Sequence, residues 1–139
     1  MKTITLTQPW ATLVAIGAKR IETRSWSTKY RGPLAIHAAK GWTPEVMRLA
    51  MTVQPFKGVL SAAGYTLFSQ LPRGVIVATC TLSDVQEAGK VMTDEFFLEH
   101  EYEFGDYTYG RFAWLLTDVQ ELPTPMPARG ALGLWECAL

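Results

Sequence analysis

The chain has 139 residues, the size of one domain, and its 13 basic and 13 acidic residues cancel. Without net positive charge, it lacks the broad field that proteins use to grip long nucleic acids through many phosphates. Composition therefore favours a small ligand, or one nucleotide of a larger one. The sequence shows neither a signal peptide nor an apolar run of about 20 residues, so we expect a cytoplasmic protein that does not enter a membrane.

Cysteine usage and short motifs exclude several classes of site. Cys80 and Cys137 are the only cysteines, and the commonest structural zinc sites need four closely spaced cysteine or histidine ligands. We expect two reduced thiols, with a disulfide between them as the alternative, and no metal. The glycine-rich loops of P-loop and dinucleotide-binding proteins are also missing, so no cofactor is expected.

Hydrophobic periodicity and turn residues divide the chain into short strands and helices. Threonines alternate with Ile4 and Leu6 as in a half-buried strand, and Pro9 and Gly17 can begin and end a helix. The expected elements are strands over 2–7, 20–26, 33–38, 75–82, 109–117 and 132–137, and helices over 9–16, 44–53, 59–71 and 94–103. The third of these helices has the weakest pattern.

The order of these elements indicates the fold class. The nearly continuous apolar run 75–82 is typical of a central strand that is covered on both faces. Helices and strands do not alternate strictly, which disfavours a doubly wound parallel sheet, and turn dipeptides are too few for an all-β sandwich. We predict a single α+β domain over residues 1–139, in which a small mixed β-barrel carries flanking helices.

One polar segment follows the first predicted helix. It carries Lys19, Arg20, Glu22, Arg24 and Trp26, and in a regular strand the last four of these would share a face. On composition alone, two interpretations are open. The segment is either a solvated outer face with a surface ion pair, or a polar pocket with an aromatic wall.

Four motifs and the C-terminal tail resemble the ASCH domain family. The motifs are Gln8-Pro9-Trp10-Ala11, Gly17-x-Lys19-x-Ile21-Glu22-x-Arg24-x-Trp26, Ala35-Ile36-His37-Ala38-Ala39-Lys40 and Gly110-Arg111-Phe112-Ala113-Trp114, and the tail is Pro127-x-x-Gly130-x-x-Gly133-Leu134-Trp135. The resemblance covers nearly the whole chain. It implies a PUA-like barrel, a cleft lined by Lys19, Glu22 and Arg24, and an association with RNA.

The resemblance also implies an activity. A smaller bacterial ASCH protein hydrolyses the amide of N4-acetylcytidine with a lysine at the position of Lys19, a threonine at that of Glu22, and a later glutamate. By this resemblance the chain is a metal-independent amidohydrolase of N4-acylated cytosine nucleosides, and the alternative is an RNA-binding or ribonucleolytic module. Because Glu22 replaces the threonine, we expect Glu22 to act as a base toward water, while Lys19 or Arg24 stabilises the oxyanion.

The remaining candidate residues have weaker signals. Trp10 and Trp26 flank the polar segment and can stack on a cytosine ring. His37 is either a hydrogen-bonded core residue or a substrate contact, and Lys40 is either solvated or a phosphate contact. Glu101 is the expected late carboxylate, although most of the acidic run around it is expected on the wet side of a helix.

Overall fold

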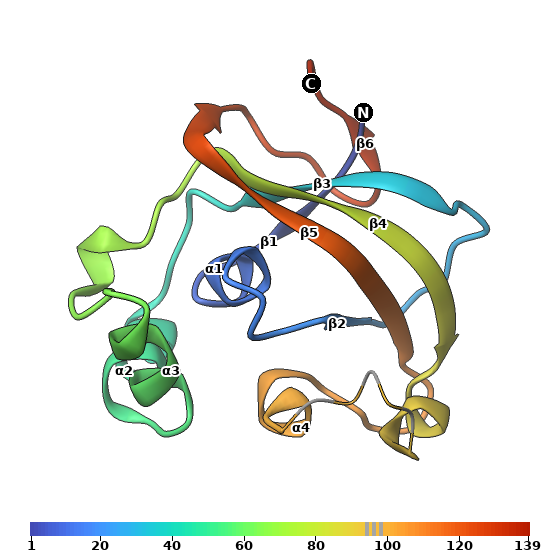
Figure 1. Ribbon diagram of the computed structural model, residues 1–139, viewed down its shortest axis with the longest axis horizontal. Coiled ribbons are helices and arrows are strands. Elements are labelled where there is room, and N and C mark those ends of the chain that lie inside the picture. The colour runs from blue at the N-terminus through green and yellow to red at the C-terminus, as the bar shows by residue number, and fades with distance from the viewer. Residues whose placement is uncertain (94, 96, 98) are drawn as a thin grey trace.

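The computed structural model describes residues 1–93, 95, 97 and 99–139. Six strands form one curved sheet in the order β2-β5-β4-β3-β1-β6, and the helices gather on its concave side (Figure 1). The strands are β1 (Lys2–Leu6), β2 (Ile21–Arg24), β3 (Gly32–Ala38), β4 (Val75–Glu87), β5 (Phe112–Pro127) and β6 (Trp135–Glu136). The helices are α1 (Trp10–Ala15), α2 (Pro44–Thr52), α3 (Phe56–Ala62) and α4 (Glu101–Phe104), with 3₁₀ turns η1 (Phe68–Gln70) and η2 (Ala88–Thr93).

The pairing confirms the predicted mixed α+β fold. β1 runs parallel to β3, and every other neighbouring pair is antiparallel. β4 lies between β3 and β5, as expected for the apolar run 75–82. β6 pairs with the start of β1, so the two ends of the chain lie side by side (Figure 1). No helix among the described residues is long and apolar enough to cross a membrane.

The two long central strands exceed their predicted bounds. Bulges in β4 let it bend and continue pairing to Glu87. β5 passes Asp118, which has a φ of 51°, and then three prolines that disfavour a strand in sequence. β2 pairs with only the first four residues of β5, so the rest of that side is an edge, where prolines are tolerated.

The prediction of a helix over 94–103 is wrong for residues 95, 97, 99 and 100, which are not helical. Residues 94, 96 and 98 of that prediction lie outside the described part of the chain. A short helix, α4, begins only at Glu101, whose side chain is buried rather than on a wet face. The predicted helix 59–71 is not continuous either. It is divided into the end of α3 and the 3₁₀ turn η1, because Gly64 between them takes a left-handed φ of 95°.

The end of α1 sets the position of the polar segment. Gly17 has a φ of 81°, its N–H donates to Val14, and the N–H of Ala18 donates to Leu13, which together make a Schellman motif. This confirms the predicted stop at Gly17. The Lys19 N–H also donates to the Leu13 carbonyl at 3.0 Å. The chain therefore turns sharply into β2, and Lys19 leaves the helix pointing inward.

The curved sheet has a seam between its β1 and β2 sides. In the described chain no strand pairing joins β2 to β1. β6 covers only Lys2 and Thr3 of β1, which leaves the later part of that edge unpaired by a strand. Arg24 on β2 crosses the seam, because its Nη2 donates to the Thr5 carbonyl at 2.7 Å. In a closed barrel, the backbone groups of this part of β1 would pair with another strand. Here they are available to side chains such as that of Arg24.

Candidate functional site

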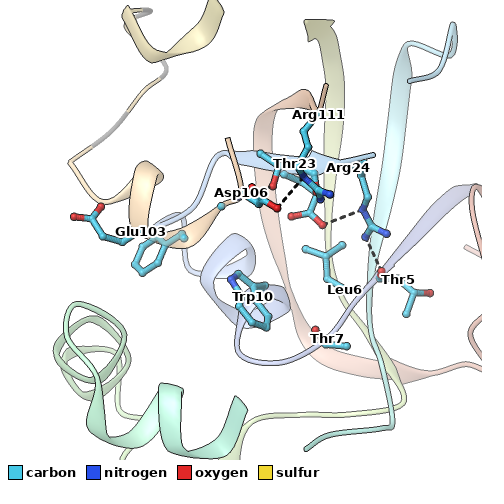
Figure 2. Close-up of a pocket in the computed structure, with 12 residues that line it drawn as sticks. Thr5, Leu6, Thr7, Trp10, Thr23, Arg24, Glu103, Asp106 and Arg111 are labelled. Atoms are coloured by element: carbon cyan, nitrogen blue, oxygen red, sulfur yellow. Dashed lines mark hydrogen bonds and ion pairs between the residues drawn. The ribbon is translucent and has the colours of Figure 1, made fainter. Parts of the chain in front are cut away.

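A cavity of about 400 Å³ opens at this seam (Figure 2). Such a volume lies in the ordinary range for small-molecule sites, roughly 300–1,000 Å³. The lining residues are 5–7 from β1 and its exit, Trp10, 22–24 from β2, 103–106 from α4 and its exit, and Arg111. We call this cavity the seam pocket.

Glu22 and Arg24 form the polar wall of the seam pocket. They alternate with the buried Ile21 and Thr23 along β2, so both side chains face the cavity. Arg24 Nε lies 3.0 Å from Glu22 Oε2, and only 23% and 13% of the two side chains are exposed. A half-buried pair fixed in this way presents a carboxylate acceptor and a guanidinium donor at set positions. The structure thus favours the pocket interpretation of the polar segment.

Lys19 is close to Glu22 but is completely buried. Its Nζ donates to the carbonyls of Ile21 at 2.6 Å and Phe104 at 2.9 Å, and it lies 3.6 Å from Glu22 Oε1. Burial lowers the pKa of the Lys19 ammonium, and the nearby carboxylates partly oppose this shift. Lys19 is not among the residues that line the seam pocket. It supports the pocket wall from behind rather than facing the cavity.

Glu101 completes the same buried cluster from α4. Its two carboxylate oxygens accept the backbone N–H groups of Arg20 at 2.9 Å and Ile21 at 3.3 Å. Burial raises the pKa of Glu101, against the effect of those donors and of Lys19. The structure therefore brings Lys19, Glu22 and Glu101 together, with only Glu22 at the cavity.

The two candidate tryptophans have different surroundings. Trp10 is half-buried, packs edge-on against Phe56 at 6.1 Å between ring centroids, and forms the aromatic wall of the seam pocket (Figure 2). Trp26 lies past the end of β2 and packs edge-on against the buried Trp114 at 4.8 Å. It does not line the seam pocket, because β2 ends at Arg24 and the predicted alternation does not reach residue 26.

His37 and Lys40 belong to a second cavity, of about 910 Å³, on the other side of Thr5. His37 is buried, with Nδ1 3.2 Å from the Thr5 hydroxyl and Nε2 2.8 Å from the Ala128 carbonyl. Lys40 is exposed at the rim. The structure does not bring either residue to the seam pocket.

Sequence reasoning missed several residues of the seam pocket. Arg111 directly precedes β5, and there its Nη2 donates to the Thr23 carbonyl at 3.1 Å and its Nε lies 3.4 Å from Asp106. The Asp106 N–H in turn donates to the Thr23 hydroxyl at 2.9 Å. Arg111 stood in one of the family motifs, which was the available signal. Thr5 and Asp106 gave none, because their places depend on long-range pairing.

The donor set of the seam pocket suits a polar organic ligand. Three carboxylates and two guanidinium groups face a wall with one indole ring. Among the described residues, no three His, Cys, Asp or Glu side chains lie together in a way that would hold a metal ion.

Both cysteines lie in the described chain, and neither forms a disulfide. Burial raises the pKa of the Cys80 thiol to about 12.

The six-stranded mixed sheet and its helices form an α+β domain with a PUA-like fold. The ASCH domain family matches residues 4–125, and the chain belongs to that family, which is associated with RNA binding. Two relatives are Activating signal cointegrator 1 of Mus musculus, 28% identical over 96% of this chain, and of Homo sapiens, 29% identical over 93%. The chain spans about a fifth of the length of those relatives, 22% and 21%.

Solved structures of the ASCH protein from Zymomonas mobilis share the fold. The wild-type protein has a TM-score of 0.51 and 15% identity, covering 91% of this chain and 72% of that one. A tyrosine-to-phenylalanine mutant of the same protein also has a TM-score of 0.51, with 16% identity over 91% of this chain and 74% of that one. At this identity the likeness shows the fold alone.

Proposed function

We propose that the seam pocket binds one nucleoside whose base carries an exocyclic amine, with cytidine as the best fit, and that it does so for an RNA-associated domain. The observation that supports this most directly is the position of Glu22. Its carboxylate lies at the cavity wall and is held there by Lys19 and Arg24. Carboxylates read cytosine by accepting a hydrogen bond from its N4 amine.

The other walls fit the same ligand. The half-buried ring of Trp10 offers a flat face on which a base can stack. Arg24 and Arg111 can donate to the O2 and ring nitrogen of cytosine or to ribose hydroxyls. Uridine would instead place its O4 acceptor against the Glu22 carboxylate, which is repulsive. Selectivity for cytidine over uridine is therefore expected to arise from one contact.

Direct binding measurements test this proposal. Calorimetric titration of the protein should give a cytidine affinity about 10- to 100-fold above that for uridine, because one correct base-edge contact discriminates by about 1–3 kcal/mol. Glu22→Gln should remove the preference, since its amide can turn to serve either base. The control Glu45→Gln changes an exposed carboxylate outside the pocket and should retain it. Equal affinity for both nucleosides in the unsubstituted protein would refute the proposal.

Amide hydrolysis of N4-acylcytidine is the second candidate, and the cluster of Lys19, Glu22 and Glu101 favours it. Glu22 would take a proton from a water molecule while the oxygen of that water adds to the acyl carbon, and Arg24 would stabilise the oxyanion that forms. The C–N bond then breaks, the exocyclic nitrogen gains the proton, and the products are cytidine and a carboxylic acid. Because Arg24 faces the cavity and Lys19 does not, the structure supports Arg24 for the oxyanion.

The same nucleosides separate binding from hydrolysis. N4-acetylcytidine still carries an N4–H for Glu22, so it should bind in either case. Chromatography of the incubated mixture would reveal cytidine and acetate only if the pocket is hydrolytic. Loss of turnover in Glu22→Gln, with turnover retained in Glu45→Gln, would establish Glu22 as the acting group. Binding without turnover would mean that the pocket recognises the nucleoside but does not hydrolyse it.

A further inference from the structure

The second cavity shares a wall with the seam pocket. We call it the basic pocket; residues 127–132, Thr5, His37, Lys40 and Gly74 form most of its lining. Thr5 separates the two cavities and is bound from both sides. Its carbonyl accepts from Arg24 at the seam pocket, and its hydroxyl lies 3.2 Å from His37 Nδ1 at the basic pocket. Thr5 is therefore the one described residue that lines both pockets.

The two pockets differ in charge. The residues that line the basic pocket include Lys40 and Arg129 and no carboxylate, whereas carboxylates outnumber cations in the seam pocket. In the described chain neither Lys40 nor Arg129 forms an ion pair. The chain as a whole has no net charge, so the cations at the basic pocket do not simply reflect an excess of basic residues. It favours a ligand that presents a base to one pocket and an anion to the other.

An aromatic and a third cation extend the basic pocket. Arg73 Nη1 donates to the Lys40 carbonyl at 3.3 Å, and its guanidinium carbon lies 5.8 Å from the Trp42 ring centroid. Trp42 is 47% exposed, which is high for so large an apolar side chain. Cations interleaved with an exposed ring are the arrangement with which proteins hold single-stranded nucleic acid.

The wall of the basic pocket is fixed before any ligand binds. The Ala128 carbonyl can only accept, so His37 Nε2 donates to it, and Nδ1 on the other side of the ring lies 3.2 Å from the Thr5 hydroxyl. Gly130 packs onto the same ring: a Cβ there would lie 2.7 Å from His37 Cε1. The Gly130 backbone therefore lies directly against the His37 side chain. A pocket built on a buried residue needs little ordering when it binds.

We infer that the basic pocket binds the backbone phosphates of single-stranded RNA whose neighbouring nucleoside occupies the seam pocket. This inference rests on the proposed function, and it makes an RNA strand, rather than a free nucleoside, the ligand of the whole site. The phosphodiester next to the bound nucleoside would pass Thr5 and meet Lys40 and Arg129. The next base would lie toward Trp42.

Fluorescence anisotropy with a labelled hexanucleotide that holds one cytosine among uridines tests the inference. In Lys40→Gln/Arg129→Gln the RNA affinity should fall about tenfold at 50 mM salt, and the slope of log K against log salt should fall by about 1.4, because each single-strand phosphate contact contributes about 0.7. Cytidine affinity should stay within about twofold, because neither residue lines the seam pocket. The matched control Lys29→Gln/Lys57→Gln removes two exposed charges outside both pockets and should retain the RNA affinity.

The outcomes separate this inference from the proposed function. Unchanged RNA affinity and salt slope in Lys40→Gln/Arg129→Gln would overturn the phosphate site, whatever cytidine does. Saturating cytidine should weaken RNA binding to the unsubstituted protein, since nucleoside and strand compete for the seam pocket. RNA binding that depends on Lys40 and Arg129 but is indifferent to cytidine would overturn the shared strand. Failure of cytidine to bind at all would refute the proposed function and with it the shared strand, whereas the phosphate contacts would still be decided by the affinity and salt slope of Lys40→Gln/Arg129→Gln.

Discussion

Replacing Lys19 by methionine separates a supporting role from a direct one. The substitution keeps an unbranched side chain that is one atom shorter, and it removes the charge and the donors. It breaks two buried hydrogen bonds, to the Ile21 and Phe104 carbonyls, and the contact with Glu22. If Lys19 supports the pocket wall, Lys19→Met should therefore lower the free energy of unfolding of the protein even when no ligand is present.

The expected loss follows from these contacts. A hydrogen bond from a charged group contributes about 1.5–3 kcal/mol, and removing one partner of a buried ion pair costs about 3–5 kcal/mol. Two carbonyls lose their donor here, but the variant also avoids burying an ammonium, whose pKa burial lowers in the folded protein. We expect a loss of about 3 kcal/mol, near the lower end of that range, and a fall in Tm of about 10 °C for a domain of this size.

Urea and thermal unfolding followed by circular dichroism would measure the change. Lys29→Met is the control, because Lys29 is exposed, and surface substitutions usually change stability by less than about 0.5 kcal/mol. A loss of less than about 1 kcal/mol for Lys19→Met would refute the supporting role. In that case any effect on ligands would have to come from direct contact.

Two further substitutions probe the walls of the pockets. Glu101→Gln presents an amide NH₂ to one of the two backbone N–H groups that the carboxylate now accepts, so unfolding should show a loss of about 2–3 kcal/mol. Burial raises the pKa of Glu101 above 4.5, so the native state binds more protons than the unfolded chain above that pH. The carboxyl's contribution to stability therefore falls as pH rises, and the cost of Glu101→Gln should be larger near pH 4 than at pH 7. Gly130→Ala would force a methyl group onto the His37 ring and should cost about 1–3 kcal/mol and weaken RNA but not cytidine binding, whereas Gly41→Ala, with open space around it, should be neutral.

Local signals predicted the part of the site that lies on one short segment. The left-handed Gly17 ends α1, and the alternation after it puts Glu22 and Arg24 on one face of β2. The approach of Lys19 to Glu22 required the turn at Gly17 and Ala18 to face inward, and the 3.6 Å separation shows that it does. The stop at Gly17 and the shared face of Glu22 and Arg24 depend on a few consecutive residues, so the sequence predicted them, whereas the choice of a pocket over a solvated face came from the family resemblance and the inward turn of Lys19 remained a condition.

The rest depends on contacts that no local pattern encodes. Glu101 stands in a run of acidic residues that looks like the wet side of a helix, yet it is buried because two N–H groups, 81 and 80 residues away, need an acceptor. His37 and Lys40 follow the family motif, but β3 carries them to the far side of Thr5 from Glu22. Register across the sheet, rather than residue type, decides which candidates share a cavity.

The seam explains why recognition is the better-supported activity of this pocket. Both oxygens of Glu22 already contact cations, Oε1 with Lys19 and Oε2 with Arg24, and Arg24 is tied in turn to the Thr5 carbonyl. A carboxylate held by two cations, one of them itself anchored, is suited to present a fixed acceptor to a ligand. To act as a base toward water, Glu22 would have to accept the proton with a lone pair that contacts neither Lys19 nor Arg24. Among the described residues no strand pairs with the edge of β1 beside Thr5, so its carbonyl is available to Arg24, and Thr5 also lines the basic pocket; the proposed reading of a base and the proposed binding of its strand therefore meet at this residue.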